Sequence, residues 1–249
     1  MFESTKYIIE NLRYGHLKDI VFCDKDMPMK LSGKIKLLRE MLDDNEYQIC
    51  VSTENAVKIL SENKWVVSFL SVDDLRNLNN KSKAEILNYA EKYYTVDNYR
   101  NFFMCFDDLI RDFKAVSTDK GYLKQLIRIE ELLRDDFSNY IVLLSTAMGI
   151  LEYKYIQKSG KLNTSKILKC EEIVVNHEAK KKSVTDMLAS VDMGSTFGVL
   201  ENYYKYGYFE NGINSSKFGR HAVQHGRYNP ERYKETDMIK TILLIYAIC

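Results

Sequence analysis

Apolar side chains recur every three or four residues along most of this chain, and that spacing constrains its fold more than any other feature. Such spacing gathers apolar side chains on one face of an α-helix. The 249 residues include only two prolines and eleven glycines, the residues that most often form turns and break helices. Because sandwiches and barrels need many turns, this shortage favours an all-α fold. The content of 45% hydrophobic and 29% charged residues is typical of a globular protein.

The helical pattern divides the chain into a series of short and medium segments. Helices are predicted at residues 6–14, 33–44, 54–63, 72–78, 83–94, 98–113, 122–137, 139–157, 166–182, 184–206, 216–227 and 237–248. Ser71–Asp74 has the pattern of a helix start, whereas Trp65–Leu70 fits a helix or a short strand equally well. The polar stretch 117–121 is the best candidate boundary. We therefore expect a helical N-terminal region of unknown role over 1–117 and an antiparallel helical bundle over 118–249.

Cysteine usage and the N-terminal segment indicate a cytoplasmic protein. The five cysteines are Cys23, Cys50, Cys105, Cys170 and Cys249. Because they are odd in number, scattered and without a Cys-x-x-Cys pair, we expect free thiols in a reducing compartment. Residues 1–15 contain two glutamates and no continuous apolar core, so they do not resemble a signal peptide. The apolar runs are too short to span a bilayer, and no membrane contact is expected.

The segment KFGRHAVQHGRYNPERY, residues 217–233, holds two of the four histidines. His221 and His225 are four residues apart and share one face of a helix, while Arg220 lies about 140° from His225 around the axis. A long arginine side chain can cross that arc, so the three polar groups can reach one surface. Gly226 then allows the chain to leave the helix.

These three side chains suit the cleavage of RNA by its own 2′-hydroxyl group. That reaction needs a base for the hydroxyl proton, an acid for the departing 5′-oxygen, and a cation for the phosphorane. Histidine titrates near neutral pH and can transfer both protons. Arginine stays charged and offers a planar fork to phosphate oxygens. No metal or other cofactor is required, because the RNA supplies the nucleophile.

The order arginine, polar residue, three spacers, histidine and glycine resembles the R-polar-x3-H motif of the HEPN (higher eukaryotes and prokaryotes nucleotide-binding) superfamily. In this resemblance Arg220, His221 and His225 occupy the diagnostic positions, with His221 where asparagine or aspartate is commoner. The resemblance covers roughly the last half of the chain. It implies a HEPN-like antiparallel bundle, metal-independent endoribonuclease activity and a homodimer that brings two motifs into one cleft. It also implies a role in phage defence or in a toxin–antitoxin pair with a cognate antitoxin.

Further basic and aromatic residues are candidates for RNA contact. The formal net charge is only +1, so binding of RNA must come from a local basic patch. The residues expected to contact RNA are Lys217, Arg227, Arg232 and Lys234. Lys180–Lys182 either adds to that patch or complements a helix C-terminus. The tyrosines at positions 203, 204, 206 and 208 either stack on bases or pack the bundle.

Two other functions remain open on the same residues. A helical pair such as His221 and His225 can bind a metal ion, with Glu231 or Glu235 as the nearest further ligands. The chain can instead be a non-catalytic module that binds RNA or a protein. Paired acids such as Asp108 and Asp112 fit a two-metal nuclease, but solvated helix faces explain them better.

Overall fold

The computed structural model describes residues 44–67, 70–116, 120–159, 196, 199–200, 202–204 and 218–248. The helices predicted at 6–14 and 166–182, and with them Lys180–Lys182, lie outside these residues. Within the described ranges every regular element is a helix, which confirms the all-α fold. None of the helices in those ranges combines the length and the apolar character needed to cross a membrane.

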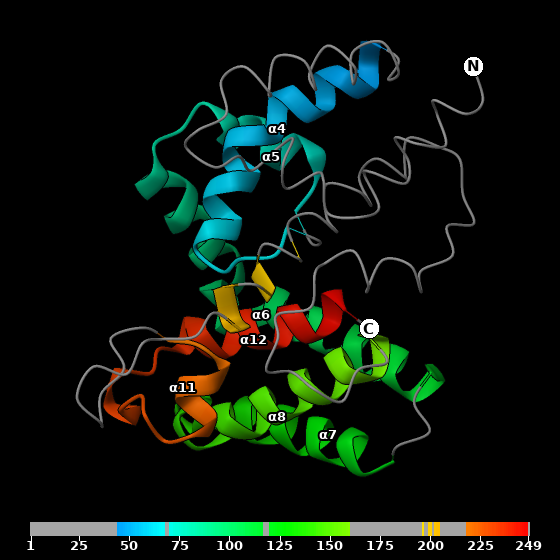
Figure 1. Cartoon of the computed structure of the whole chain (residues 1–249). Coiled ribbons are helices and arrows are strands. Elements are labelled where there is room, and N and C mark those ends of the chain that lie inside the picture. The colour runs from blue at the N-terminus through cyan, green and yellow to red at the C-terminus, as the bar shows by residue number, and fades with distance from the viewer. Residues whose placement is uncertain are drawn as a thin grey trace.

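The observed helices follow most of the predicted segments closely. The elements are α4 (Asp44–Glu62), α5 (Val72–Asn79), α6 (Lys83–Val116), α7 (Lys120–Asp135), the 3₁₀ turn η1 (Phe137–Asn139), α8 (Tyr140–Ser159), α11 (Arg220–Gln224), the 3₁₀ turn η2 (Pro230–Arg232) and α12 (Glu235–Ala247) (Figure 1). The segment Trp65–Val67, left open between helix and strand, forms neither and connects α4 to α5 as irregular chain. Its three side chains are buried, which accounts for its apolar sequence.

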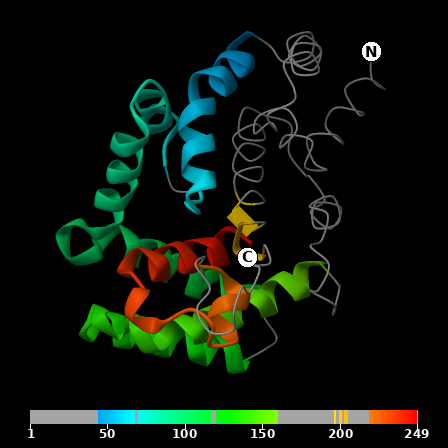
Figure 2. The same ribbon diagram turned by 60° about the vertical axis from the view of Figure 1, so that its left-hand side comes forward.

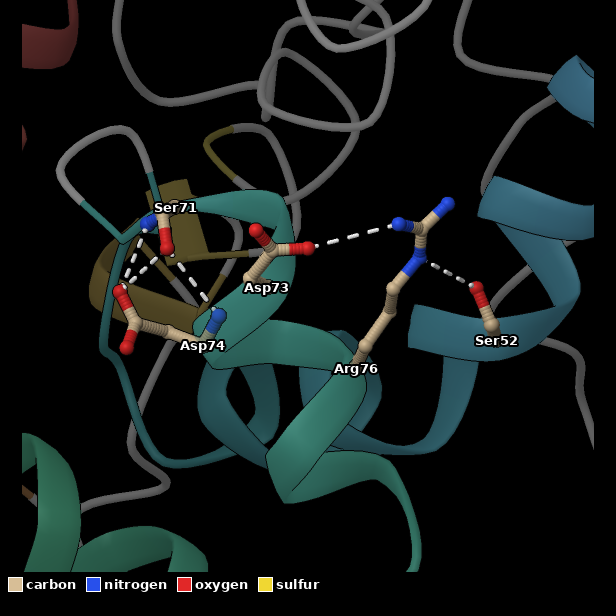
Figure 3. A network of polar contacts seen from close by, with 5 residues as sticks. All are labelled: Ser52, Ser71, Asp73, Asp74 and Arg76. Carbon is tan, nitrogen blue, oxygen red and sulfur yellow. Dashed lines mark hydrogen bonds and ion pairs between the residues drawn. The ribbon is translucent and has the colours of Figure 1, made fainter.

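A small polar network fixes the corner between α4 and α5 (Figure 3). The Ser71 hydroxyl accepts a hydrogen bond from the backbone N–H of Asp74, and the Asp74 carboxylate accepts one from the backbone N–H of Ser71, each at 3.1 Å. This reciprocal cap satisfies donors that the first turn of a helix leaves free. Arg76 then reaches Asp73 on its own helix and the Ser52 hydroxyl on α4. The predicted helix start at Ser71 is confirmed.

Helix α12 forms the centre of the core. It lies between the α4–α5 pair and the α7–α8 pair in both views of the molecule (Figures 1 and 2), and it packs against α8 and α6. Its buried residues are Met238, Ile239, Thr241, Ile242, Leu243, Leu244 and Ile245. A helix that is apolar on nearly every face must be enclosed by other elements, which agrees with the position of α12 among the described helices.

Helix α6 is interrupted where the sequence predicts the gap between two helices. Within Val96–Tyr99 the backbone leaves the helical conformation, and Asp97, Asn98 and Tyr99 have φ values of 50°, 52° and 62°. A bulky residue in this left-handed region is strained. The Tyr99 ring compensates by stacking on Phe137 at 3.7 Å between centroids, and its hydroxyl donates to Glu235 at 2.7 Å. The break therefore links α6 to η1 and α12.

The central position of α12 can be tested by replacing a core isoleucine on this helix. A surface isoleucine on α8 is the matched control. Ile242 has no exposed surface, whereas Ile141 is 44% exposed. Ile242→Ala should lower the free energy of unfolding by about 2–5 kcal/mol, because it leaves a cavity. Ile141→Ala should change it by less than about 1 kcal/mol. Urea unfolding followed by circular dichroism measures both, and equal losses would contradict the central position of α12.

Candidate functional site

The motif lies on α11, a helix of five residues that is shorter than the predicted helix at 216–227. Residues 216 and 217 lie outside the described ranges, and Phe218 and Gly219 are not helical. A Cβ atom on Gly219 would come within 3.0 Å of the Tyr203 carbonyl oxygen, so this close backbone approach requires glycine. At the other end Gly226 has a φ of +63°, as expected for a helix-ending glycine. Two glycines thus set the bounds of the motif helix.

Lys64, at the end of α4, anchors the chain just before the motif. Its partly buried ammonium group donates a hydrogen bond to the Phe218 carbonyl oxygen and lies 4.9 Å from the centroid of the Phe218 ring. Burial lowers the pKa of Lys64 to about 8, with Asp237 acting in the opposite direction and Lys240 in the same one. This contact connects the region predicted as N-terminal to a residue two positions before Arg220.

The two histidines of the motif are in direct contact. The rings of His221 and His225 are 4.3 Å apart between centroids and meet edge to face. His225 is exposed, while His221 is partly buried. Partial burial lowers the pKa of His221, and the nearby His225, Arg220 and Arg227 lower it further. An imidazole with a lowered pKa is largely neutral near pH 7, so it can accept a proton.

Arg220 points toward α8, where Glu152 binds it. The Arg220 Nη2 forms an ion pair with the Glu152 Oε1, and the two side chains are 16% and 19% exposed. The Arg220 Nε is buried and has no hydrogen-bond partner among the residues that the structure describes. The guanidinium is therefore held by a carboxylate through one nitrogen while a second donor stays unused.

Tyr204 completes this group of side chains, which we name the Arg220 cluster: Arg220, Glu152 and Tyr204. In the described part of the chain, the Tyr204 hydroxyl is buried without a hydrogen-bond partner. Burial raises the pKa of Tyr204, Glu152 raises it further and Arg220 lowers it, so the phenol lies within electrostatic range of both. Its ring stacks on Tyr155 of α8, with 4.7 Å between centroids. The cluster therefore joins α8, α11 and the helical residues 202–204.

The residues predicted to contact RNA lie in different surroundings. Lys217 falls outside the described residues. Arg227 is partly buried and close enough to His221 to affect its pKa. The guanidinium of Arg232 lies over the Tyr228 ring at 4.6 Å from its centroid, and Lys234 precedes α12, with its backbone N–H bonded to Asp237 at 3.0 Å. Of the three in the described ranges, Arg227 is the one that acts on the histidine pair. Arg232 and Lys234 instead interact with residues in the segment after the motif.

The two tyrosines of the run that the structure describes have different surroundings: Tyr203 packs the bundle, whereas Tyr204 belongs to the Arg220 cluster. Tyr203 has no exposed surface, and its hydroxyl lies 3.3 Å from that of Thr241 on α12. It therefore packs the bundle and offers no face to a base. Tyr206 and Tyr208 lie outside the described residues.

The metal-site candidates are without a third ligand in the part of the chain that the structure describes. No group of three histidine, cysteine, aspartate or glutamate side chains gathers there with metal-binding geometry. The Glu235 carboxylate accepts the bond from Tyr99, and Glu231 accepts one from Asn229 at 3.2 Å. Asp108 pairs with Arg111 at 2.8 Å, which agrees with a solvated helix face.

Sequence reasoning missed Glu152, although a signal was present. Glu152 is the only acidic residue between positions 140 and 159, on a helix that is otherwise mostly apolar. A lone carboxylate on a helix bound for the core needs a partner, because an unpaired buried charge is costly. That argument could have marked Glu152 as the partner of a cation, but a sequence separation of 68 from Arg220 hides which cation it is.

The comparisons with known proteins add no relative. The chain matches no protein-family model, no curated protein and no solved structure. The function must therefore be argued from the geometry of the motif and the chemistry of its side chains.

The contact between the two imidazoles predicts a coupled titration. In the His225→Gln variant the pKa of His221 should rise, because one positive neighbour is lost, but it should stay below its ordinary value of 6.5, because burial is the largest cause of the shift. Arg220→Gln should raise it as well. NMR titration of the imidazole Hε1 signals measures both. A pKa of His221 that is the same in all three proteins would show that the charges do not interact.

Proposed function

We propose that this protein is a metal-independent endoribonuclease that cleaves RNA through attack of a 2′-hydroxyl group on the neighbouring phosphate. The observation that carries the proposal is the contact between His221 and His225, with Arg220 close enough to lower the pKa of His221. Two imidazoles at one point can accept and donate the two protons of the reaction. The guanidinium supplies the positive charge that a phosphorane needs. The resemblance to the HEPN motif supports the same reaction.

The environments of the two histidines favour separate roles. His221 has a lowered pKa, so in the proposal its neutral ring accepts the proton of the 2′-hydroxyl and orients the phosphate. His225 is exposed at the end of α11 and protonates the departing 5′-oxygen. The 2′-oxygen forms its bond to phosphorus as the bond from phosphorus to the 5′-oxygen breaks. The products are a 2′,3′-cyclic phosphate and a 5′-hydroxyl end.

Arg220 stabilises the negative charge of the phosphorane in this scheme. A phosphate oxygen must approach a guanidinium whose Nη2 already contacts Glu152. Glu152 therefore sets the orientation of the arginine and also competes for it. Arg227 adds positive charge close enough to His221 to lower its pKa. Together with Lys217, Arg232 and Lys234, it is proposed to bind the RNA backbone.

The proposal extends to the assembly and its biological setting. A two-fold homodimer would place the exposed His225 of each protomer at one RNA-binding cleft. The family resemblance suggests a toxin or antiviral-defence nuclease in the cytoplasm that a cognate antitoxin or defence partner restrains.

Cleavage of total tRNA in EDTA tests the reaction. The wild-type protein should produce fragments with 2′,3′-cyclic phosphate ends. Arg220→Ala and His225→Ala should each lower the rate about 100-fold or more, since each removes a group that acts on the transition state. Arg232→Ala is the matched control for loss of a nearby positive charge and should mainly weaken RNA binding. Gel analysis and end-group chemistry measure the products.

The results separate the three functions considered for the motif. Full activity in both alanine variants would overturn the site assignment. Binding of RNA without any cleavage would favour a non-catalytic module. Activity that EDTA abolishes and zinc restores would favour a metal site on His221 and His225.

A further inference from the structure

Within the described residues, two buried hydrogen-bond donors of the Arg220 cluster have no acceptor. They are the Nε of Arg220 and the hydroxyl of Tyr204. Both belong to side chains that interact electrostatically with Glu152. Buried polar groups are almost always bonded in folded proteins, and a donor left without an acceptor is destabilising. Two of them in one cluster indicate a site that lacks an acceptor.

The arrangement around the guanidinium points to the kind of acceptor that is missing. The Nε and one Nη of an arginine form an edge that matches two oxygens of a carboxylate or a phosphate. Glu152 contacts the Nη2 and leaves the Nε without a partner. An anion with several oxygens, such as a phosphate, can use the Nε and still leave oxygens for a further donor.

We propose that Tyr204 is a phosphate-binding residue, whose hydroxyl and the Arg220 Nε together donate to the phosphodiester of the RNA. The proposal rests on the ribonuclease function given above and adds a residue to its site. In this proposal the phosphodiester first meets the exposed part of the Arg220 side chain, competes with Glu152 for the Nη2, and then gives the buried Nε the acceptor that it lacks. The 16% exposure of the Arg220 side chain shows that part of it reaches the surface.

The stacking of Tyr204 fits this role. Its ring is fixed against Tyr155, with 4.7 Å between centroids and 28° between planes. A phenol held by its ring presents the hydroxyl in one position without further loss of conformational freedom. Tyr203, the preceding residue, has the opposite arrangement, because its hydroxyl is already in contact with Thr241.

The Tyr204→Phe variant tests the proposal, since it removes a single oxygen and keeps the ring. Its thermal unfolding midpoint should equal or exceed that of the wild type, because a buried donor without an acceptor is removed. Its affinity for a 2′-O-methyl RNA oligonucleotide, which cannot be cleaved, should fall about 10- to 100-fold. Stabilisation by inorganic phosphate, measured as a rise in the midpoint, should shrink as well.

Tyr203→Phe is the matched control. It loses the contact with Thr241, so its midpoint should fall while its affinity for the oligonucleotide stays at the wild-type level. If Tyr204→Phe binds the oligonucleotide and phosphate as well as the wild type does, the assignment of Tyr204 is overturned. A lower midpoint for Tyr204→Phe would overturn it too, because the hydroxyl would then have a partner in the free protein.

The two proposals can fail separately. If the wild-type protein cleaves RNA and Tyr204→Phe equals it in binding and rate, the nuclease proposal stands and the role of Tyr204 is overturned. If the wild-type protein does not cleave RNA but binds phosphate and the oligonucleotide through Tyr204, the nuclease proposal is overturned and the anion site is supported.

Discussion

The ion pair between Arg220 and Glu152 is the interaction on which the geometry of the motif depends. Helix α11 has five residues, too few for a helix that is stable on its own. It is held by its buried Ala222 and Val223, by the Lys64 contact at Phe218, and by Glu152 across the interface with α8. Because both charged side chains are more than four-fifths covered, removal of either one leaves an uncompensated charge in poorly solvated surroundings.

The helices were predictable from the sequence because their apolar spacing is local information. The cap at Ser71 and the break in α6 near residue 96 follow from residues that lie within a few positions of each other. The contacts that shape the site join residues far apart in the chain. The approach of Gly219 to Tyr203 and the pairing of Arg220 with Glu152 depend on how the helices pack. No periodicity encodes those contacts, so the length of α11 and the partner of Arg220 were not foreseen.

The positive charges of the site disfavour protonation of His221 but attract an anion. Burial lowers the pKa of His221, and the charges of His225, Arg220 and Arg227 lower it further, so they favour the neutral imidazole in the free protein. A bound phosphate would offset those charges and favour the protonated ring. In the proposed reaction His221 therefore becomes a better proton acceptor as the phosphate is bound and its negative charge grows. The near-neutral whole chain does not oppose this effect, because the relevant field is local.

The described part of the N-terminal region is connected to the site by a shared group of partly buried charges. Lys64, at the end of α4, and Lys240 and Asp237 of α12 each have a pKa shifted by burial toward the neutral form. The Lys240 ammonium also lies 4.7 Å from the centroid of the Trp65 ring. Separation of α4 from α12 would break these contacts together with the bond from Lys64 to the Phe218 carbonyl. Since Phe218 is two residues before Arg220, this bond connects the end of α4 to the start of the motif helix.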